Sequence, residues 1–409
     1  MIWFKLGWRN LFRNKRRTII EISSIAGSVL LGIWWNNAAV GTYEKMIDDG
    51  VRMGSGHIGI YHPDYLELRK TEQVIAVDDL VAELESDPDV AAVYPRLMVP
   101  GLLRSSRNSR PTAILGIDFA REQGSNPLLD PKRLVEGSLP EKSRETVIGK
   151  VLAQELGLSL GKKFVFMAQG SDGEIVSTLL RVSGIIESHV REIDNATVFI
   201  DREQLGKIIG YTSSAHEIGI MLHNNQLIKQ AFPRIERIVS RYENAKPFTW
   251  EEAMPELSSA VRFDHAGLQV MVILLYLIVG IGTVNTILMS VIERTREFGV
   301  FRAIGLNSTG IRKMVMSEAL VLAFTGVLVG LILGSLLSAY TAMYGLDFSR
   351  FMSEQGFGGT IFEPVMYGGW DIRGMMYLCG GMIVVALIAS LYPTYWVMKI
   401  RPSEAMRRY

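Results

Sequence analysis

Four stretches of the chain are nearly free of charged residues and apolar around their whole helical surface. A helix rises about 1.5 Å per residue, so about 20 apolar residues cross a hydrocarbon core of about 30 Å. Apolar side chains on every face over this length are typical of a membrane span and not of a helix in a soluble core. We therefore predict transmembrane helices at residues 18–40, 266–292, 315–340 and 374–398.

The first span follows a basic segment and carries the small residues Ala38 and Ala39, which are also features of a secretory signal peptide. Its apolar run, from Ile19 to Val40, is longer than the roughly 7–15 residues of a signal-peptide core. We expect an uncleaved membrane anchor.

Residues 41–265 have a different pattern, in which short β-rich runs alternate with amphipathic helical runs. Runs bounded by Gly, Pro, Asn and Asp predict strands, and apolar residues at helical spacing predict helices. The predicted strands are HIGIYH, VAAVYPRLMV, TAILGID, KKFVFMA, STLLRVSGIIES, NATVFI and EIGIML, and the predicted helices lie near residues 77–86, 151–156, 201–210 and 225–240. Residues 104–110 and 170–173 are predicted to be hairpin turns or surface loops. This pattern predicts a mixed α+β domain between the first two spans.

The charge is balanced overall, with 43 Lys and Arg against 42 Asp and Glu, which gives no indication of nucleic-acid binding. Its distribution is uneven. Residues 1–17, 293–313 and 399–409 together hold 15 basic and 3 acidic residues, whereas residues 41–265 hold 26 basic and 33 acidic ones. Basic short segments stay on the cytoplasmic side of a membrane. We therefore expect both termini and the 293–314 segment in the cytoplasm, and the domain and the 341–373 loop outside.

The fold class that follows is membrane α+β: four transmembrane helices with a large mixed α/β extracytoplasmic domain between the first and second spans. The first 17 residues have the pattern of a helix lying in the membrane interface, with one apolar and one basic row. These rows consist of Phe4, Trp8, Leu11 and Phe12, and of Lys5, Arg9 and Arg13. A juxtamembrane tail that merely obeys the charge rule is the alternative.

Motifs of catalysis are missing from the sequence. Gly161 and Lys162 lack the first glycine and the hydroxyl residue of a phosphate-binding loop, and Ser55 lacks the spacing of a nucleophile elbow. His57 and His62 do not have metal-ligand spacing on a strand. The single cysteine, Cys379, lies in the fourth span and leaves the redox state of the outer compartment undetermined. We predict no catalytic residue and no metal site, and therefore no enzyme.

The spans contain a few polar residues. Glu21 and Glu318 each lie near the end of a span, where a headgroup position is the simple expectation and a bond to a neighbouring cytoplasmic element is the alternative. Asn285 is in mid-span and is predicted to bond across helices. Glycines at positions 326, 330 and 334 form a row that predicts close helix packing.

The segment ERTREFGVFRAIG, residues 293–305, is a charged run directly after the second span. If it continues that span, Glu293 and Glu297 are one helical turn apart, and Gly305 ends the helix in a left-handed conformation. Asn307, Ser308 and Thr309 can then cap a second helix beginning near Ile311. We predict a rigid cytoplasmic hairpin that transmits force from a cytoplasmic protein, with a solvated loop as the alternative.

The run ER-x-x-EFGVFRAIG, the following SEAL at residues 317–320 and the ending YPTYWVMKIRPSEAMRRY resemble the FtsX-like/MacB-type family of ABC transporter permeases. The opening WRNLFRNKRRT and the GHIGIYHPDY after the first span look most like its lipoprotein-releasing branch, LolC/LolE. The resemblance covers the whole order of spans and domain, and it is specific at the membrane ends and vague across the domain.

The resemblance implies a permease half that works with cytoplasmic ABC ATPase subunits and with a second permease copy or sibling. It implies no cofactor in this chain, with ATP and Mg bound by the partner ATPase. Glu318 matches the family's polar position at the head of the third span, and Pro402 and Glu404 match its C-terminal signature. The residues that match the ATPase-coupling hairpin are Glu293, Arg294, Glu297, Arg302 and Gly305.

The function that this resemblance favours is extraction of lipoproteins or other lipid-anchored cargo from the inner membrane, with possible handover to a periplasmic carrier. Spans one and two of two protomers would form the cavity for acyl chains, so membrane lipids are expected neighbours. Two alternatives stay open: FtsX-like mechanotransmission to a cell-wall hydrolase without cargo transport, and MacB-like efflux with a periplasmic adaptor.

Overall fold

A computed structural model of the chain describes residues 15–351, 355–357, 360–362 and 364–398. The chain divides into two compact units. The helical unit contains the described parts of residues 1–44, 263–348 and 365–409, and the domain contains residues 45–262 and the described part of 349–364. The predicted interfacial helix falls almost entirely outside the described residues.

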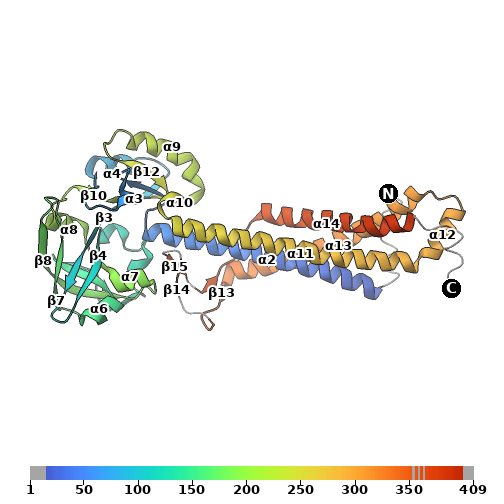
Figure 1. Cartoon of the computed structure of the whole chain (residues 1–409), viewed down its shortest axis with the longest axis horizontal. Helices are drawn as coiled ribbons and strands as arrows, with labels where there is room; N and C mark the ends of the chain where they lie inside the picture. The colour runs from blue at the N-terminus through green and yellow to red at the C-terminus, as the bar shows by residue number, and fades with distance from the viewer. Residues whose placement is uncertain (1–14, 352–354, 358–359, 363, 399–409) are drawn as a thin grey trace. The chain divides into compact units, whose positions relative to one another are not determined.

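The helical unit is built from four long helices and one short one (Figure 1). All four long helices are long and apolar enough to cross a membrane, which confirms the four predicted spans. The first two are longer than the apolar patterns indicated, because polar residues continue each helix beyond its apolar run. The helices are α2 (Lys15–Met53), α11 (Pro255–Glu293), α12 (Thr295–Ala303), α13 (Ser308–Tyr344) and α14 (Ile372–Met398), and two short strands, β13 (Leu346–Asp347) and β16 (Val365–Met366), pair between the last two.

The glycine row of α13 packs directly against α2. A Cβ atom placed on Gly330 would lie 2.6 Å from the Ala26 carbonyl oxygen and 2.7 Å from the Val29 Cβ. A Cβ atom on Gly326 would lie 2.7 Å from the Ile25 Cβ on α2, and one on Gly334 would lie 3.1 Å from the Ile33 Cβ, a looser contact. The backbones therefore approach at a distance that only glycine permits, as the small-residue spacing predicted.

Gly330→Ala is expected to destabilise the helical unit, because the added methyl group meets the backbone of α2 and overpacking costs about 1–3 kcal/mol. Gly380→Ala is the matched control, since a Cβ atom there meets nothing within 4 Å. Thermal unfolding of both variants in detergent would measure the difference. Equal melting temperatures would show that the helices have room to separate.

The domain is organised around a mixed ten-stranded sheet within the described residues. Its order is β12-β1-β11-β3-β4-β9-β6-β8-β5, with β7 paired to β3 and β8. The pairs β4–β9 and β6–β8 are parallel and the others antiparallel. The strands are β1 (Ile58–Tyr61), β3 (Val90–Arg104), β4 (Ser109–Ile117), β5 (Leu134–Gly137), β6 (Glu145–Gly149), β7 (Lys163–Gln169), β8 (Ile175–Ile186), β9 (Thr197–Asp201), β11 (Glu217–Leu222) and β12 (Lys246–Thr249).

Short helices and two small strand pairs complete the domain. The pairs are β2 (Ile75–Ala76) with β10 (Ser214–Ala215), and β14 (Gln355–Phe357) with β15 (Thr360–Phe362). The helices are α3 (Tyr65–Leu68), α4 (Asp78–Glu85), α5 (Phe119–Glu122), α6 (Lys150–Leu156), α7 (Arg191–Ala196), α8 (Arg202–Ile209), α9 (Ile228–Val239) and α10 (Trp250–Ala253), with 3-10 turns at Pro127–Leu129 and Asn225–Leu227.

All seven predicted strands and all four predicted helices of the domain are confirmed. The two predicted hairpin turns join β3 to β4 and β7 to β8. One apolar core lies against α6 and α8, and a second lies against α4 and α9. In the main sheet the pattern missed β5, β6 and β12, which have only four or five residues each and are too short to show a clear period, although β6 is almost fully buried.

Candidate functional site

The charged run after the second span forms the α12 hairpin, which we define as residues 293–313. The chain does not continue α11 as one helix: α11 ends at Glu293, Arg294 has non-helical backbone angles, and α12 begins at Thr295. Gly305 has a φ of 102° and ends α12 as predicted. The Gly305 and Leu306 amides donate to the last carbonyls of the helix, at 3.1 and 2.9 Å.

The second helix of the hairpin, α13, begins at Ser308, slightly earlier than predicted. The side chain of Asn307 caps it by accepting a hydrogen bond from the Gly310 amide at 2.8 Å. Two caps thus fix the turn between α12 and α13, and the alternative of a solvated loop is wrong for this segment.

Arg294 is the centre of a polar network at the base of the hairpin. Its guanidinium donates to Glu297 at 3.1 Å and to Glu318 at 3.0 Å, and Ser290 donates to the other oxygen of Glu318 at 3.3 Å. The Arg294 side chain is only 11% exposed, and it lies 5.3 Å from the ring centre of Phe298. A partly desolvated arginine with two carboxylate partners joins α11, α12 and α13 at one point.

An apolar cluster holds α12 against the spans. Phe298 is the buried residue that α12 adds to this cluster, and Trp396 packs against the cluster. The other members come from the two spans: Ile287 and Val291 on α11, and Ile311, Met314, Val315 and Ala319 on α13. Three apolar side chains away from this cluster are exposed: Val300 and Phe301 on α12, at 42% and 37%, and Ile304 directly after the helix, at 79%.

The first span is connected to the second by charged side chains. Arg17 donates to the two carboxylate oxygens of Glu293 at 3.1 and 3.4 Å. Glu21 is 3% exposed and accepts hydrogen bonds from Thr283 and Thr286 at 2.9 and 2.7 Å. Glu21 is therefore covered by α11, and its expected depth at the headgroups stays a prediction. For Glu318 the structure shows the second of the two expected arrangements, in which its carboxylate bonds to the neighbouring hairpin.

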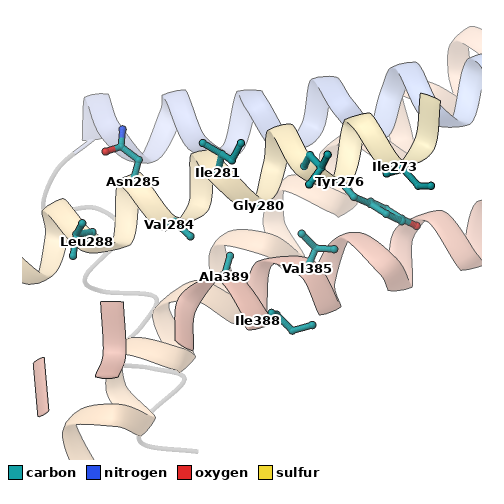
Figure 2. Close-up of a pocket in the computed structure, with 11 residues that line it drawn as sticks. Ile273, Tyr276, Gly280, Ile281, Val284, Asn285, Leu288, Val385, Ile388 and Ala389 are labelled. Atoms are coloured by element: carbon teal, nitrogen blue, oxygen red, sulfur yellow. The ribbon is translucent and has the colours of Figure 1, made fainter. Parts of the chain in front are cut away.

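Asn285 does not bond across helices as predicted. It is exposed on α11 and lines an apolar groove of about 660 Å³ between α11 and α14. Figure 2 shows this groove, with Tyr276 and Val284 on one wall and Val385 and Ile388 on the other. Threonines take the role expected of Asn285, because they lie on the side of α11 that faces α2.

The remaining predicted positions are less defined. Arg302 is half-buried in the last turn of α12. Pro402 and Glu404 lie outside the described residues. The sequence reasoning missed Thr283 and Thr286, whose spacing of three residues on one helix face was the available signal.

A buried ion cluster in the domain was also missed. Arg96, on β3, is 1% exposed and pairs with Glu122 through two hydrogen bonds of 2.9 and 2.8 Å, and with Glu217 at 3.3 Å. It also donates to the carbonyl oxygens of Arg52 at 2.9 Å and Met53 at 2.8 Å, which are the last of α2. Arg96 therefore caps the C-terminal end of α2 and ties it to the central strand.

The two carboxylates stabilise the charge of the buried Arg96. Burial by itself would lower the pKa of Arg96, but the charge of Glu122 and its hydrogen bonds, followed by Glu217, outweigh burial and raise it. The Tyr61 hydroxyl donates to Glu217 at 2.7 Å, and burial together with this carboxylate raises the pKa of Tyr61. The arginine thus keeps its charge at any pH that the fold tolerates.

Arg96→Met is expected to destabilise the domain by about 3–5 kcal/mol, because two buried carboxylates lose their charge partner. Arg121→Met is the control: its pair with Glu85 is more than 40% exposed, and loss of such a pair costs about 0–1 kcal/mol. Denaturant unfolding of the full chain would measure both. Similar losses in the two variants would contradict a central role for Arg96, and partial recovery on adding Glu122→Gln and Glu217→Gln would confirm the charge explanation.

Two family models match the chain. The MacB-like periplasmic core domain matches residues 20–238, which is more than half of the chain, and the FtsX-like permease C-terminal model matches residues 269–402. The chain belongs to the FtsX/MacB-type family of ABC transporter permeases. The α12 hairpin lies within the second match, and the Arg96 cluster lies within the first.

Two relatives and one solved structure illustrate the similarity. The lipoprotein-releasing system transmembrane protein LolC of Xylella fastidiosa strain Temecula1 is 24% identical over 432 residues, covering 98% of each chain. The macrolide export ATP-binding/permease protein MacB 2 of Aeromonas hydrophila is 24% identical over 86% of this chain and 54% of its own length. The extracellular domain of the Gram-positive transporter YknZ matches 47% of this chain and 99% of that domain, at 15% identity with a TM-score of 0.35.

Proposed function

We propose that this permease couples ATP hydrolysis by a separate cytoplasmic ATPase to movement of its domain. The observation that carries the proposal is the α12 hairpin: a short helix fixed to two spans by Arg294 and an apolar cluster, with apolar residues exposed on its other side. A rigid element with an exposed apolar surface suits a lasting contact with another protein. The basic residues around it support a cytoplasmic position.

The ATPase is proposed to be a partner, and ATP and Mg are its ligands. The chain has no phosphate-binding loop, whereas the name of the MacB 2 relative includes an ATP-binding part and that relative is nearly twice as long as the matched region. A second copy or a sibling of this permease would complete the membrane complex. The proposed location is the inner membrane, with both termini in the cytoplasm.

The cargo that we propose is a lipoprotein or another lipid-anchored molecule. The support is a similarity to LolC that extends over nearly the whole length of both chains. The apolar groove of Figure 2 and the exposed apolar side of α11 would face lipid or a second copy. A periplasmic carrier would then receive the extracted cargo.

Ile304→Asp is expected to abolish copurification of the ATPase, because a charge replaces the most exposed apolar side chain of the α12 hairpin. Ile175→Asp on β8 is the matched control, since Ile175 is 74% exposed and lies in the domain. Purification from native membranes in mild detergent, with mass spectrometry of the copurified nucleotide-binding subunits, would compare them. Normal ATPase recovery with Ile304→Asp would contradict the proposed contact.

Charge reversal at Glu297 or Arg302 is expected to uncouple ATP hydrolysis from domain movement while insertion stays normal. Glu297→Lys places a positive charge next to Arg294 and weakens the connection of α12 to the spans. Spin-label distances between the domains of two copies, with and without ATP, would measure the movement. Glu67→Lys, at an exposed position on α3, controls for charge reversal itself.

The three transport and signalling functions predict different results on depletion of the protein. Lipoproteins retained in the inner membrane would favour cargo extraction. Loss of cell-wall hydrolysis without retained lipoproteins would favour mechanotransmission. Increased sensitivity to small toxic compounds alone would favour efflux with an adaptor.

A further inference from the structure

A second cavity in the helical unit combines an apolar interior with a polar end. It has a volume of about 510 Å³ and is bounded by α2, α11 and α14. Ile33, Val272 and Leu378 provide apolar walls from the three helices. At the end where α14 begins, its lining becomes polar, with Asn36, His265, Gln269 and Asp371. This division along one cavity matches the two parts of an amphiphile.

Exposed aromatic side chains place the polar end at the level of lipid headgroups. Trp370 is 52% exposed and Tyr377 is 78% exposed, and they flank the start of α14. Tryptophan and tyrosine gather at the membrane–water interface, where an apolar ring also meets polar groups. The apolar part of the cavity is therefore at the depth of acyl chains, and the polar part is within reach of headgroups.

Asp371 provides the formal charge of the cavity. One carboxylate oxygen accepts from the Gly374 amide at 2.9 Å and caps α14, and the other accepts from the Asn36 side chain at 3.2 Å. A carboxylate has about four acceptor sites. Among the described residues no basic group forms an ion pair with Asp371, so acceptor sites of its carboxylate remain for a cation in the cavity.

We propose that this cavity binds one glycerophospholipid with a primary ammonium headgroup, of the phosphatidylethanolamine type. The ammonium donates to Asp371, and an acyl chain lies between Ile33, Val272 and Leu378. Charge complementarity selects this headgroup, because the carboxylate of Asp371 would repel an anionic headgroup. Arg373 is exposed and does not line the cavity, so it does not neutralise the site.

The proposed lipid site differs from the groove between α11 and α14 and from a cargo cavity shared by two protomers. The groove of Figure 2 has Asn285 and the Tyr276 hydroxyl as its polar side chains and no charged group to select a headgroup. The lipid site is complete within one chain, and it includes α14. The proposal therefore goes beyond the proposed function and does not depend on the cargo or the ATPase.

The test is lipid retention by the full-length protein in nanodiscs containing equal amounts of phosphatidylethanolamine and phosphatidylglycerol. After transfer to mild detergent, native mass spectrometry counts the lipids that remain bound. The wild type is expected to retain phosphatidylethanolamine preferentially by up to about fivefold, the ratio that a partly exposed ion pair of about 1 kcal/mol produces.

Asp371→Asn is the informative variant, because asparagine caps a helix as well as aspartate does but carries no charge. We expect it to fold normally and to lose the preference. Asp347→Asn, on β13 outside the cavity, is the matched control and should keep the preference. An equal ratio in the wild type, or an unchanged preference in Asp371→Asn, would overturn the proposal.

A synthetic diacyl lipopeptide with a free N-terminal amine distinguishes a lipid site from a cargo site. Retention of phosphatidylethanolamine in its presence is the expected result. Displacement of the phospholipid by stoichiometric lipopeptide would overturn the assignment in favour of cargo. A result that contradicts the proposed ATPase contact would not change the expected lipid preference. Each of the two proposals can therefore be overturned without the other.

Discussion

Pairing of polar groups inside a hydrocarbon environment is the constraint on which the helical unit depends. A carboxylate such as Glu21 has no water to bond to within a span, so it must find donors on a neighbouring helix. Thr283 and Thr286 supply them and thereby fix how α2 faces α11. The glycine row of α13 then brings the third span against an adjacent side of α2. One side chain pairing and one close backbone contact together define the helix order.

Pairing of partly buried charges also holds the α12 hairpin in place although it is highly charged. Arg294 brings a positive charge to the end of α11, where Glu318 and Glu297 compensate it. The apolar cluster beneath α12 excludes water and strengthens these contacts. A load applied to the exposed side of α12 would therefore move α11 and α13 rather than bend a loop, which is the property that a coupling element needs.

In the domain, Arg96 has the corresponding role. It satisfies the last carbonyls of α2 and two buried carboxylates with one guanidinium, so the end of this helix and the strand β3 cannot separate without leaving charges unpaired. Such clusters stabilise little in total but are costly to break. They are suited to a connection that must hold its geometry while force passes through it.

The sequence by itself determined the four apolar spans, most of the strands and helices of the domain core, and the caps of the hairpin, because hydrophobic period and turn residues act locally. Only the tertiary structure decided that Glu21 is covered by α11, that Asn285 faces outward and that Arg96 meets residues 26 and 121 positions along the chain. The break between α11 and α12 at Arg294 was also visible only in the structure, where the side chain of Arg294 pairs with Glu318 on α13. Contacts between residues far apart in the sequence produce no periodic pattern. The partners of these polar residues therefore depend on how the helices and strands pack.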